Sequence, residues 1–252
     1  MRFASIVPTD CLDDGAFQGS DCHLVLAQQA SRDARYFEFY RKRARLGDTV
    51  ILDNGAYEGQ LVTFEELLRL TRELKPTVLV MPDKLGDYEE TKRMEQQFLP
   101  MAMRASYVPQ LMPVLQSSDT ADVWQWIRTY REHTFYKWIA FPRCMGEQRT
   151  ILASGLKYAA LWDSTCKYWA LGMLDGDVEE LSELSHLGFY GCDSSAPVWR
   201  GLQGFSLNEA DRTAWQVQGT PVDFSTKLDT IPFKHLELAK SNLAEVLAEC
   251  RE

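Results

Sequence analysis

The chain has 252 residues, with 36 Asp and Glu against 27 Lys and Arg, which gives a formal net charge of −9. A hydrophobic content of 45% is ordinary for a folded enzyme and excludes a disordered chain. The acid excess argues against a protein that coats nucleic acid regardless of sequence, but it permits a local basic rim. No apolar run approaches the roughly 20 residues of a membrane span.

The six cysteines are scattered and form no CxxC or CxC pair. In a chain of this size they indicate reduced thiols in a cytoplasmic compartment instead of a disulfide framework. Zinc sites usually draw two ligands from one tight turn, so the same scatter argues against structural zinc. Residues 1–8 lack the long apolar core of a signal peptide and resemble a first strand. We therefore expect a cytoplasmic protein without a metal, another cofactor or a membrane partner.

Eight apolar, β-rich runs recur along the chain, each bounded by turn residues or a helical pattern. Most are continuously apolar, which is typical of parallel strands buried on both faces. The predicted strands are Phe3–Val7, His23–Ala27, Thr49–Asp53, Thr77–Met81, Leu111–Gln116, Lys137–Phe141, Tyr168–Gly172 and Phe189–Asp193.

Amphipathic segments of helical length separate these strands. Thr63 and Glu66 form a capping-box pattern, and three further segments begin with an Asp suited to capping. The predicted helices are Arg32–Leu46, Thr63–Leu74, Asp87–Met103, Asp119–Glu132, Asp177–His186 and Phe233–Cys250. Gly47, Gly155 and Gly188 lie where helices should end.

Eight alternating β and α units predict an α/β fold in which a single (β/α)8 TIM barrel forms one catalytic domain over residues 1–252. A doubly wound open sheet is the alternative. The segment Thr9–Asp21 is too short and Gly-rich for a full helix, so we expect a distorted first unit.

Polar side chains follow four of the predicted strands: Asp53, Asp83, Gln116 and Asp193. The C-terminal ends of barrel strands form the active-site face, so these side chains should meet. Histidine is nearly absent from these positions, which argues against a Ser–His triad and a His-based metal site.

Carboxylates without histidine or metal suit chemistry at the anomeric carbon of a sugar, where one carboxylate attacks and another manages protons. The remaining Asp and Gln suit recognition of a purine-like edge. Taken singly, each of these Asp residues is most often a turn or capping residue, and each nearby aromatic or basic side chain has an ordinary packing or surface role. The argument therefore rests on four such residues at four separate strand ends.

The order of these blocks resembles the catalytic barrel of the tRNA-guanine transglycosylases, including their relatives that insert 7-deazaguanines into DNA. The segments that carry the resemblance are Asp53-Asn54-Gly55-Ala56-Tyr57-Glu58, Met81-Pro82-Asp83, Pro113-Val114-Leu115-Gln116, Ile139-Ala140-Phe141 with Gly146-Glu147, Leu171-Gly172 and Gly191-Cys192-Asp193. They span roughly residues 49–200, with one block per strand.

The resemblance implies that Asp193 is the nucleophile of a covalent glycosyl-enzyme and that Asp53 is the general acid/base. It also implies that Asp83 and Gln116 recognise the base. The remaining base contacts that it implies are the backbone around Ala140 and Phe141 and a sandwich of the ring by Tyr57 and Leu171, with Gly172 beside them.

Several features depart from the family pattern. The CxCxxC…H zinc segment and an RNA-binding domain have no counterpart, so we expect no zinc subdomain. Asn54, Ala56 and Ser117 replace Ser, Gly and Gly of the pattern, and the family's Pro-Thr-Arg is reduced to Pro197-Val198-Trp199-Arg200. These changes favour the compact, virus-type members that act on DNA.

The sequence therefore predicts replacement of guanine in DNA by a 7-deazaguanine such as preQ0, with tRNA as the second choice of substrate. Phosphates would be held by a set chosen from Lys84, Arg143, Lys167, Arg200 and Lys227. Two alternatives stay open: a barrel hydrolase of nucleosides or small glycosides, and a catalytically silent barrel that only binds. The oligomeric state also stays open, because the missing zinc segment carries the family's usual dimerisation element.

Overall fold

A computed structural model describes residues 1–17, 20–57, 59–117, 119–132, 136–159, 162, 165–173, 177–218 and 220–251. Glu58, which belongs to one of the family-like segments, lies outside these residues. Within the described ranges, no helix combines the length and the apolar character needed to cross a membrane.

The described residues form eight strands in two parallel four-stranded sheets, with the orders β1-β8-β7-β6 and β2-β3-β4-β5. The strands are β1 Arg2–Ser5, β2 Cys22–Leu26, β3 Thr49–Asp53, β4 Val78–Val80, β5 Gln110–Met112, β6 Trp138–Pro142, β7 Lys167–Leu171 and β8 Gly191–Ser194. Each overlaps a predicted strand, β3 has the predicted bounds, and the largest difference is at β5, which ends four residues before the predicted Gln116.

Short contacts join the two sheets. Beyond β5, a parallel bridge pairs Val114 with Ala140, and the Ala140 amide donates to the Pro113 carbonyl at 2.9 Å. Between β1 and β2, the Ser20 hydroxyl lies 2.8 Å from the Phe3 carbonyl. The predicted alternation of strands and helices is confirmed, whereas the strand pairing shows two sheets and does not show one closed barrel.

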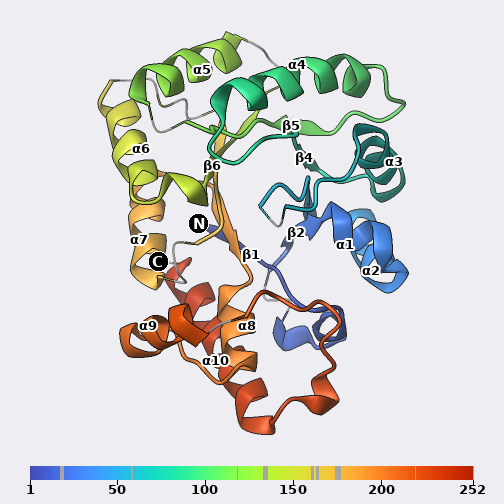
Figure 1. The fold of residues 1–252 in the computed structure, drawn as a ribbon, viewed down its shortest axis with the longest axis vertical. Helices are drawn as coiled ribbons and strands as arrows, with labels where there is room; N and C mark the ends of the chain where they lie inside the picture. Colours follow the sequence, from blue (N-terminus) through green and yellow to red (C-terminus); the bar gives the residue numbers. More distant parts are fainter. Residues whose placement is uncertain are drawn as a thin grey trace.

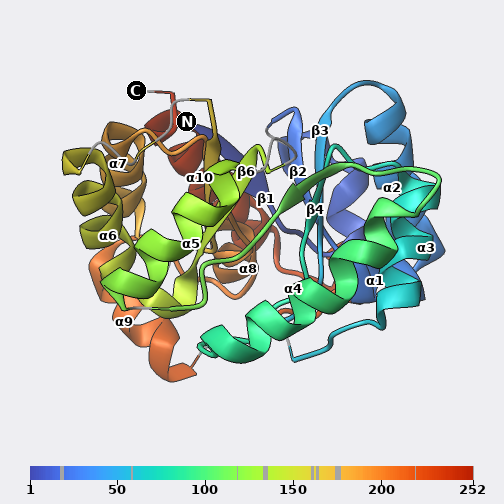
Figure 2. The same cartoon turned by 90° about the horizontal axis from the view of Figure 1, so that it is seen from above.

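Helices surround the strands, as Figures 1 and 2 show, and the chain termini meet where the Met1 amino group donates to the Cys250 carbonyl at 2.7 Å. The helices are α1 Ala27–Arg32, α2 Ala34–Arg45, α3 Phe64–Leu74, α4 Tyr88–Met103, α5 Thr120–Glu132, α6 Gln148–Tyr158, α7 Val178–Leu187, α8 Ala196–Leu202, α9 Glu209–Gln218 and α10 Phe233–Glu249.

Side-chain caps begin several helices where the sequence predicted them. Thr63 accepts from the Glu66 amide at 3.2 Å, and Asp87 and Asp177 cap α4 and α7. The predicted helix Arg32–Leu46 corresponds to α2, which begins one residue after its N-cap Asp33. The shorter helix α1, which ends just before Asp33, was not predicted.

Two other details of the helix prediction need correction. Gly155 lies inside α6 and does not end it, because the flanking Leu152 and Leu156 are buried and keep the helix packed on the core. Helices α8 and α9 were not predicted; α8 is buried from Pro197 to Leu202 and therefore lacks amphipathic periodicity.

The first unit is distorted, as predicted. The described part of the connection from β1 to β2 contains only two 3-10 helices, η1 Thr9–Asp13 and η2 Gly15–Phe17. A 3-10 helix is short and has weaker hydrogen bonds than an α-helix, so the first unit covers less of the sheet than the units with an α-helix do.

The core has an inner layer between the two sheets and an outer layer between the sheets and the helices. Side chains alternate along each strand, so every second residue faces inward. Inner residues include Ala4 on β1, Ile51 on β3, Met112 on β5 and Trp169 on β7. The alternation therefore determines which side chains appear two residues later, at the strand ends.

Gly201→Ala should destabilise the fold by about 1–3 kcal/mol, because a Cβ there would lie 2.2 Å from the Ala239 Cα of α10. Gly155→Ala is the matched control: its Cβ meets nothing within 4 Å, so it should stabilise α6 by about 0.5–1 kcal/mol. Urea unfolding measures both. Equal effects of the two changes would contradict close packing of α8 on α10.

Candidate active site

The C-terminal ends of the strands enclose a pocket of about 100 Å³. Side chains alternate along each strand, so the residues two positions beyond those of the inner layer also face inward. They form the floor of this pocket. Sixteen residues line it: Ile6, Leu24, Leu26, Asp53, Ala56, Tyr57, Asp83, Leu85, Gln116, Pro142, Arg143, Leu171, Gly172, Asp193, Ser194 and Ser195. Three carboxyl groups and a carboxamide from four strand ends thus meet in a small, largely apolar space.

Asp193 lies near the end of β8 and is 5% exposed. Its Oδ1 accepts a hydrogen bond from the Trp169 indole Nε1 at 2.7 Å, and its Oδ2 accepts from the Gly172 amide at 3.3 Å. The pKa of Asp193 is raised to about 7, chiefly by burial and also by the nearby Asp53 charge, against the lowering effect of the indole donor.

Asp53 ends β3 and is half-buried at the pocket wall. Its Oδ2 accepts from the Gly55 amide at 2.9 Å, in a turn that Gly55 makes with a φ of +84°. Burial raises the pKa of Asp53 to about 6. Because its charge also raises the pKa of Asp83 and Asp193, Asp53 is electrostatically linked to both.

Asp83 follows β4 and is held by two amide donors. Asn54 Nδ2 lies 2.6 Å from its Oδ1, and Gln116 Nε2 lies 2.5 Å from its Oδ2. Burial raises the pKa of Asp83 to about 7, even though both amide donors favour the ionised form.

The orientation of the Gln116 amide is fixed by donors at its other end. Its Oε1 accepts from the Gly86 amide at 2.8 Å and lies 3.1 Å from Cys144 Sγ. An oxygen must therefore face Gly86, which leaves the NH2 group for Asp83 and for the pocket. One of its two hydrogens is used by Asp83, so the other is available to a ligand.

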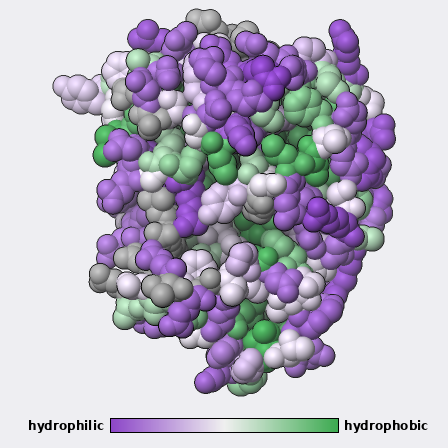
Figure 3. Space-filling view, viewed as in Figure 1, coloured by the Kyte–Doolittle hydropathy of each residue, from purple (hydrophilic) through white to green (hydrophobic). Residues whose placement is uncertain are grey.

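A larger groove of about 660 Å³ adjoins the pocket and shares part of its lining, including Tyr57, Arg143 and Ser195. Hydrophilic residues dominate the face in Figure 3, which views the molecule as Figure 1 does, and hydrophobic ones gather toward its middle. Most of the other groove residues come from α1, α8 and residues 220–225, and the rest are Asp33, Gln60 and Trp215 of α9.

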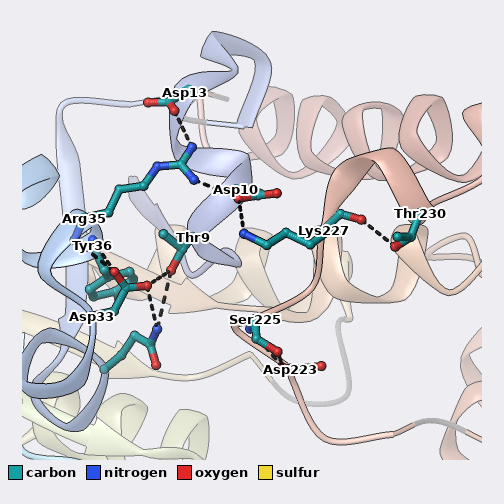
Figure 4. Close-up of polar contacts among 11 residues, drawn as sticks. Thr9, Asp10, Asp13, Asp33, Arg35, Tyr36, Asp223, Ser225, Lys227 and Thr230 are labelled. Carbon is teal, nitrogen blue, oxygen red and sulfur yellow. Dashed lines mark hydrogen bonds and ion pairs between the residues drawn. The ribbon is translucent and has the colours of Figure 1, made fainter.

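Residues 220–225 form one wall of the groove and are anchored to the first unit. Lys227 Nζ and Arg35 Nη1 both reach Asp10 Oδ1, at 3.0 and 2.8 Å (Figure 4). The Thr9 amide donates to the Phe224 carbonyl at 3.2 Å. The distorted first unit therefore supports this wall of the groove.

Most of the predicted site residues line the pocket together: Asp53, Tyr57, Asp83, Gln116, Arg143, Leu171, Gly172 and Asp193. Tyr57 is 58% exposed at the rim, where Arg143 Nη1 donates to its hydroxyl at 3.2 Å. These eight residues were expected to lie together at the strand ends, and they line one pocket. Their chemical roles stay predictions.

Neither Ala140 nor Phe141, whose backbone was predicted to contact the base, is among the residues that line the pocket. Phe141 faces outward and packs against Tyr168 and Phe189 of the outer core. Ala140 faces inward but lies one layer below the pocket, and its amide and carbonyl are used by the bridge to residues 113–115. Pro142, two residues further along β6, takes the pocket position.

The predicted phosphate ligands need a similar correction. Arg200 is 0% exposed, with its guanidinium 4.8 Å from the Trp215 ring centroid, so it cannot meet a phosphate at the surface. Lys167 begins β7, at the edge of the sheet opposite the pocket. Lys227 is paired with Asp10, and Lys84 is exposed outside the pocket lining. Arg143 lines both cavities.

Three residues of the site were not predicted from the sequence: Asn54, which donates to Asp83, Trp169, which donates to Asp193, and Arg149, which donates to the Gly172 carbonyl. Alternation along β6 could have identified Pro142 in place of Phe141. No local pattern could have paired Trp169 with Asp193, because their contact depends on how β7 and β8 align.

No group of three or more His, Cys, Asp or Glu side chains in the described ranges is arranged to hold a metal ion. No protein-family model matches the chain, and no curated protein matches it.

Asp53→Asn should stabilise the fold at pH 8 by about 1–3 kcal/mol and have little effect at pH 4. The raised pKa means that wild-type protein loses stability as the pH rises from about 4 to about 7, because the folded state resists ionisation. The Asn side chain can still accept from Gly55.

Urea unfolding at both pH values measures this difference, with Asp229→Asn, an exposed carboxylate in the 3-10 helix η4 Leu228–Thr230, as the control. A variant that is stabilised equally at both pH values, or destabilised at pH 8, would contradict the burial of a charge at Asp53.

Proposed function

We propose that the protein is a base-exchange glycosyltransferase that removes guanine from a polynucleotide and installs a 7-deazaguanine through a covalent Asp193 intermediate. In this proposal the two sheets are the halves of one (β/α)8 barrel, and residues 1–252 form one catalytic domain. The observation that carries the proposal is the convergence of Asp53, Asp83, Gln116 and Asp193 on one pocket.

The chemistry needs one ionised and one protonated carboxyl group. Asp193 attacks C1′ of the sugar, the bond from C1′ to the base breaks, and the protonated Asp53 supplies the proton that the departing base takes up. Because two neighbouring carboxylates resist ionising together, the pair retains one proton near neutral pH. The incoming base reverses the sequence: Asp53 accepts its proton, its nitrogen attacks C1′, and the ester bond to Asp193 breaks.

Recognition of the base falls to Asp83 and Gln116. An ionised Asp83 accepts from the ring N–H and exocyclic NH2 of guanine, since each carboxylate oxygen can accept more than one hydrogen bond. The remaining Gln116 N–H donates to the guanine carbonyl. Guanine and a 7-deazaguanine such as preQ0 share this edge, which explains how one pocket serves both the leaving and the entering base.

The adjoining groove favours a polynucleotide over a free nucleoside. It is several times larger than the pocket, and Arg143 lies where the two meet. DNA is the proposed substrate, with tRNA second, and the target base must be flipped out or single-stranded to enter. A hydrolase of free nucleosides would use the pocket alone and leave the groove without a role.

Labelled guanine or preQ0 should be incorporated into single-stranded DNA, and Asp193→Asn should reduce incorporation at least about 10³-fold, as expected for loss of a nucleophile. Asp229→Asn is the control for the charge change. Gel analysis of labelled DNA, duplex DNA and tRNA ranks the substrates. Full incorporation by Asp193→Asn, or release of base from free nucleosides without any exchange, would contradict the proposal.

The exchange rate should pass through a maximum near pH 6 to 7 and fall on both sides, because Asp83 and Asp193 must be ionised and Asp53 must be protonated, and burial raises the pKa of the first two to about 7 and that of Asp53 to about 6. Initial rates at saturating DNA and base measure this profile. A rate that rises steadily from about pH 5 to about pH 9 would show that the reaction needs no protonated carboxyl group.

A further inference from the structure

We propose that Trp169 and Arg149 are positioning residues that orient Asp193 from two sides, so that its Oδ2 atom, and not Oδ1, forms the bond to C1′. The identity of that bond rests on the proposed function, whereas the orientation of the carboxylate does not.

Trp169 holds Asp193 from inside the sheet. Its indole Nε1 donates to Oδ1 at 2.7 Å, and the Trp169 side chain is 0% exposed, so no solvent water competes for this donor. The ring crosses the neighbouring strand at Gly191, where an added Cβ would lie 2.2 Å from Trp169 Cζ3. Only glycine at this position of β8 leaves room for the indole to reach the carboxylate.

Arg149 acts on the other oxygen through the backbone of Gly172. Gly172 donates its N–H to Asp193 Oδ2 at 3.3 Å, and its carbonyl accepts from Arg149 Nη1 at 2.7 Å. The positive φ of +75° at Gly172 turns these two groups toward their partners.

Arg149 is itself fixed by Glu180 of α7. Its Nε lies 2.7 Å from Glu180 Oε1, and Arg149 is 0% exposed near the start of α6. A buried ion pair contributes little net stability, because removing both charges from water opposes their attraction. This pair is better explained by the geometry that it imposes on Gly172 than by the stability of the fold.

The two oxygens of Asp193 consequently face different surroundings. Oδ1 faces Trp169, which belongs to the inner core and is not among the residues that line the pocket. Oδ2 has the longer hydrogen bond and faces Gly172, which does line the pocket. When Oδ2 bonds to C1′ and the base leaves with a proton from Asp53, Oδ1 becomes the ester carbonyl and still accepts from the indole.

Trp169→Phe tests this orientation, because it removes the donor and retains an aromatic ring. Trp138→Phe is the matched control: Trp138 lies in the same inner layer, 6.0 Å from Trp169 between ring centroids, and makes no contact with Asp193 that the structure records among the described residues. We expect Trp169→Phe to lower kcat about 10- to 100-fold, with KM within about twofold, and Trp138→Phe to change kcat less than about threefold.

The pH profile separates positioning from a general loss of structure. The indole donor favours the ionised form of Asp193, so its removal should move the acidic limb of the rate profile to higher pH by about one unit. The acidic limb depends on Asp83 as well as on Asp193. The groups that shift the pKa of Asp193 are Asp53 on β3, the Gly172 amide, Arg149 on α6 and Trp169 on β7, and only Trp169 is changed. Equal profiles and equal kcat for the two Trp variants would overturn the proposal.

A second variant addresses the Arg149 side and covers the case in which Trp169→Phe does not fold. Replacing the pair with apolar side chains, Arg149→Met with Glu180→Leu, should preserve the fold and lower kcat about tenfold or more. A folded double variant with wild-type kcat would remove Arg149 from the proposal.

A measurement that does not depend on catalysis separates the proposed orientation of Asp193 from the proposed base-exchange function. Titration of the Asp193 carboxyl carbon by ¹³C NMR should show a higher pKa in Trp169→Phe than in Trp138→Phe, even if wild-type protein exchanges no base. In that event the base-exchange function fails and the orientation stands. Exchange by the wild type with identical titrations in both Trp variants would leave the function in place and refute the orientation.

Discussion

The burial of three carboxyl groups at the C-terminal ends of parallel strands is the constraint on which the rest of the site depends. Removing a carboxylate from water disfavours its charge, and each of the three has a raised pKa for that reason. Hydrogen-bond donors next to these groups partly offset the cost of burying their charge. Asn54 and Gln116 donate to Asp83, the Gly55 amide donates to Asp53, and Trp169 donates to Asp193. Such an arrangement lowers stability near neutral pH, as functional sites commonly do.

Alternation along the strands converts this constraint into a pocket. The inner layer is filled by large apolar side chains, and the polar residues stand one step further toward the strand ends. Trp169 connects the inner layer with the pocket, because its ring packs over Gly191 while its Nε1 donates to the Asp193 carboxylate. The packing of the core and the orientation of Asp193 are therefore parts of one arrangement.

The sequence predicted the alternating α/β units, the strand-end carboxylates and the distorted first unit, because each depends on local periodicity, capping or turn composition. It placed Arg200 at the surface, since the charge of a side chain does not tell whether its helix is buried. Closure into one barrel was a topological inference, and strand pairing yields two sheets instead. The contacts of Trp169 and Arg149 depend on the alignment of distant segments and have no local signal.

The most direct measurement of the central claim is intact-mass and peptide-mass analysis of the protein after incubation with a guanine-containing oligonucleotide and a 7-deazaguanine base. The account predicts a covalent adduct of protein and oligonucleotide in which the modified peptide contains Asp193. An adduct on a different residue, or exchange of the base with no adduct on Asp193, would contradict it.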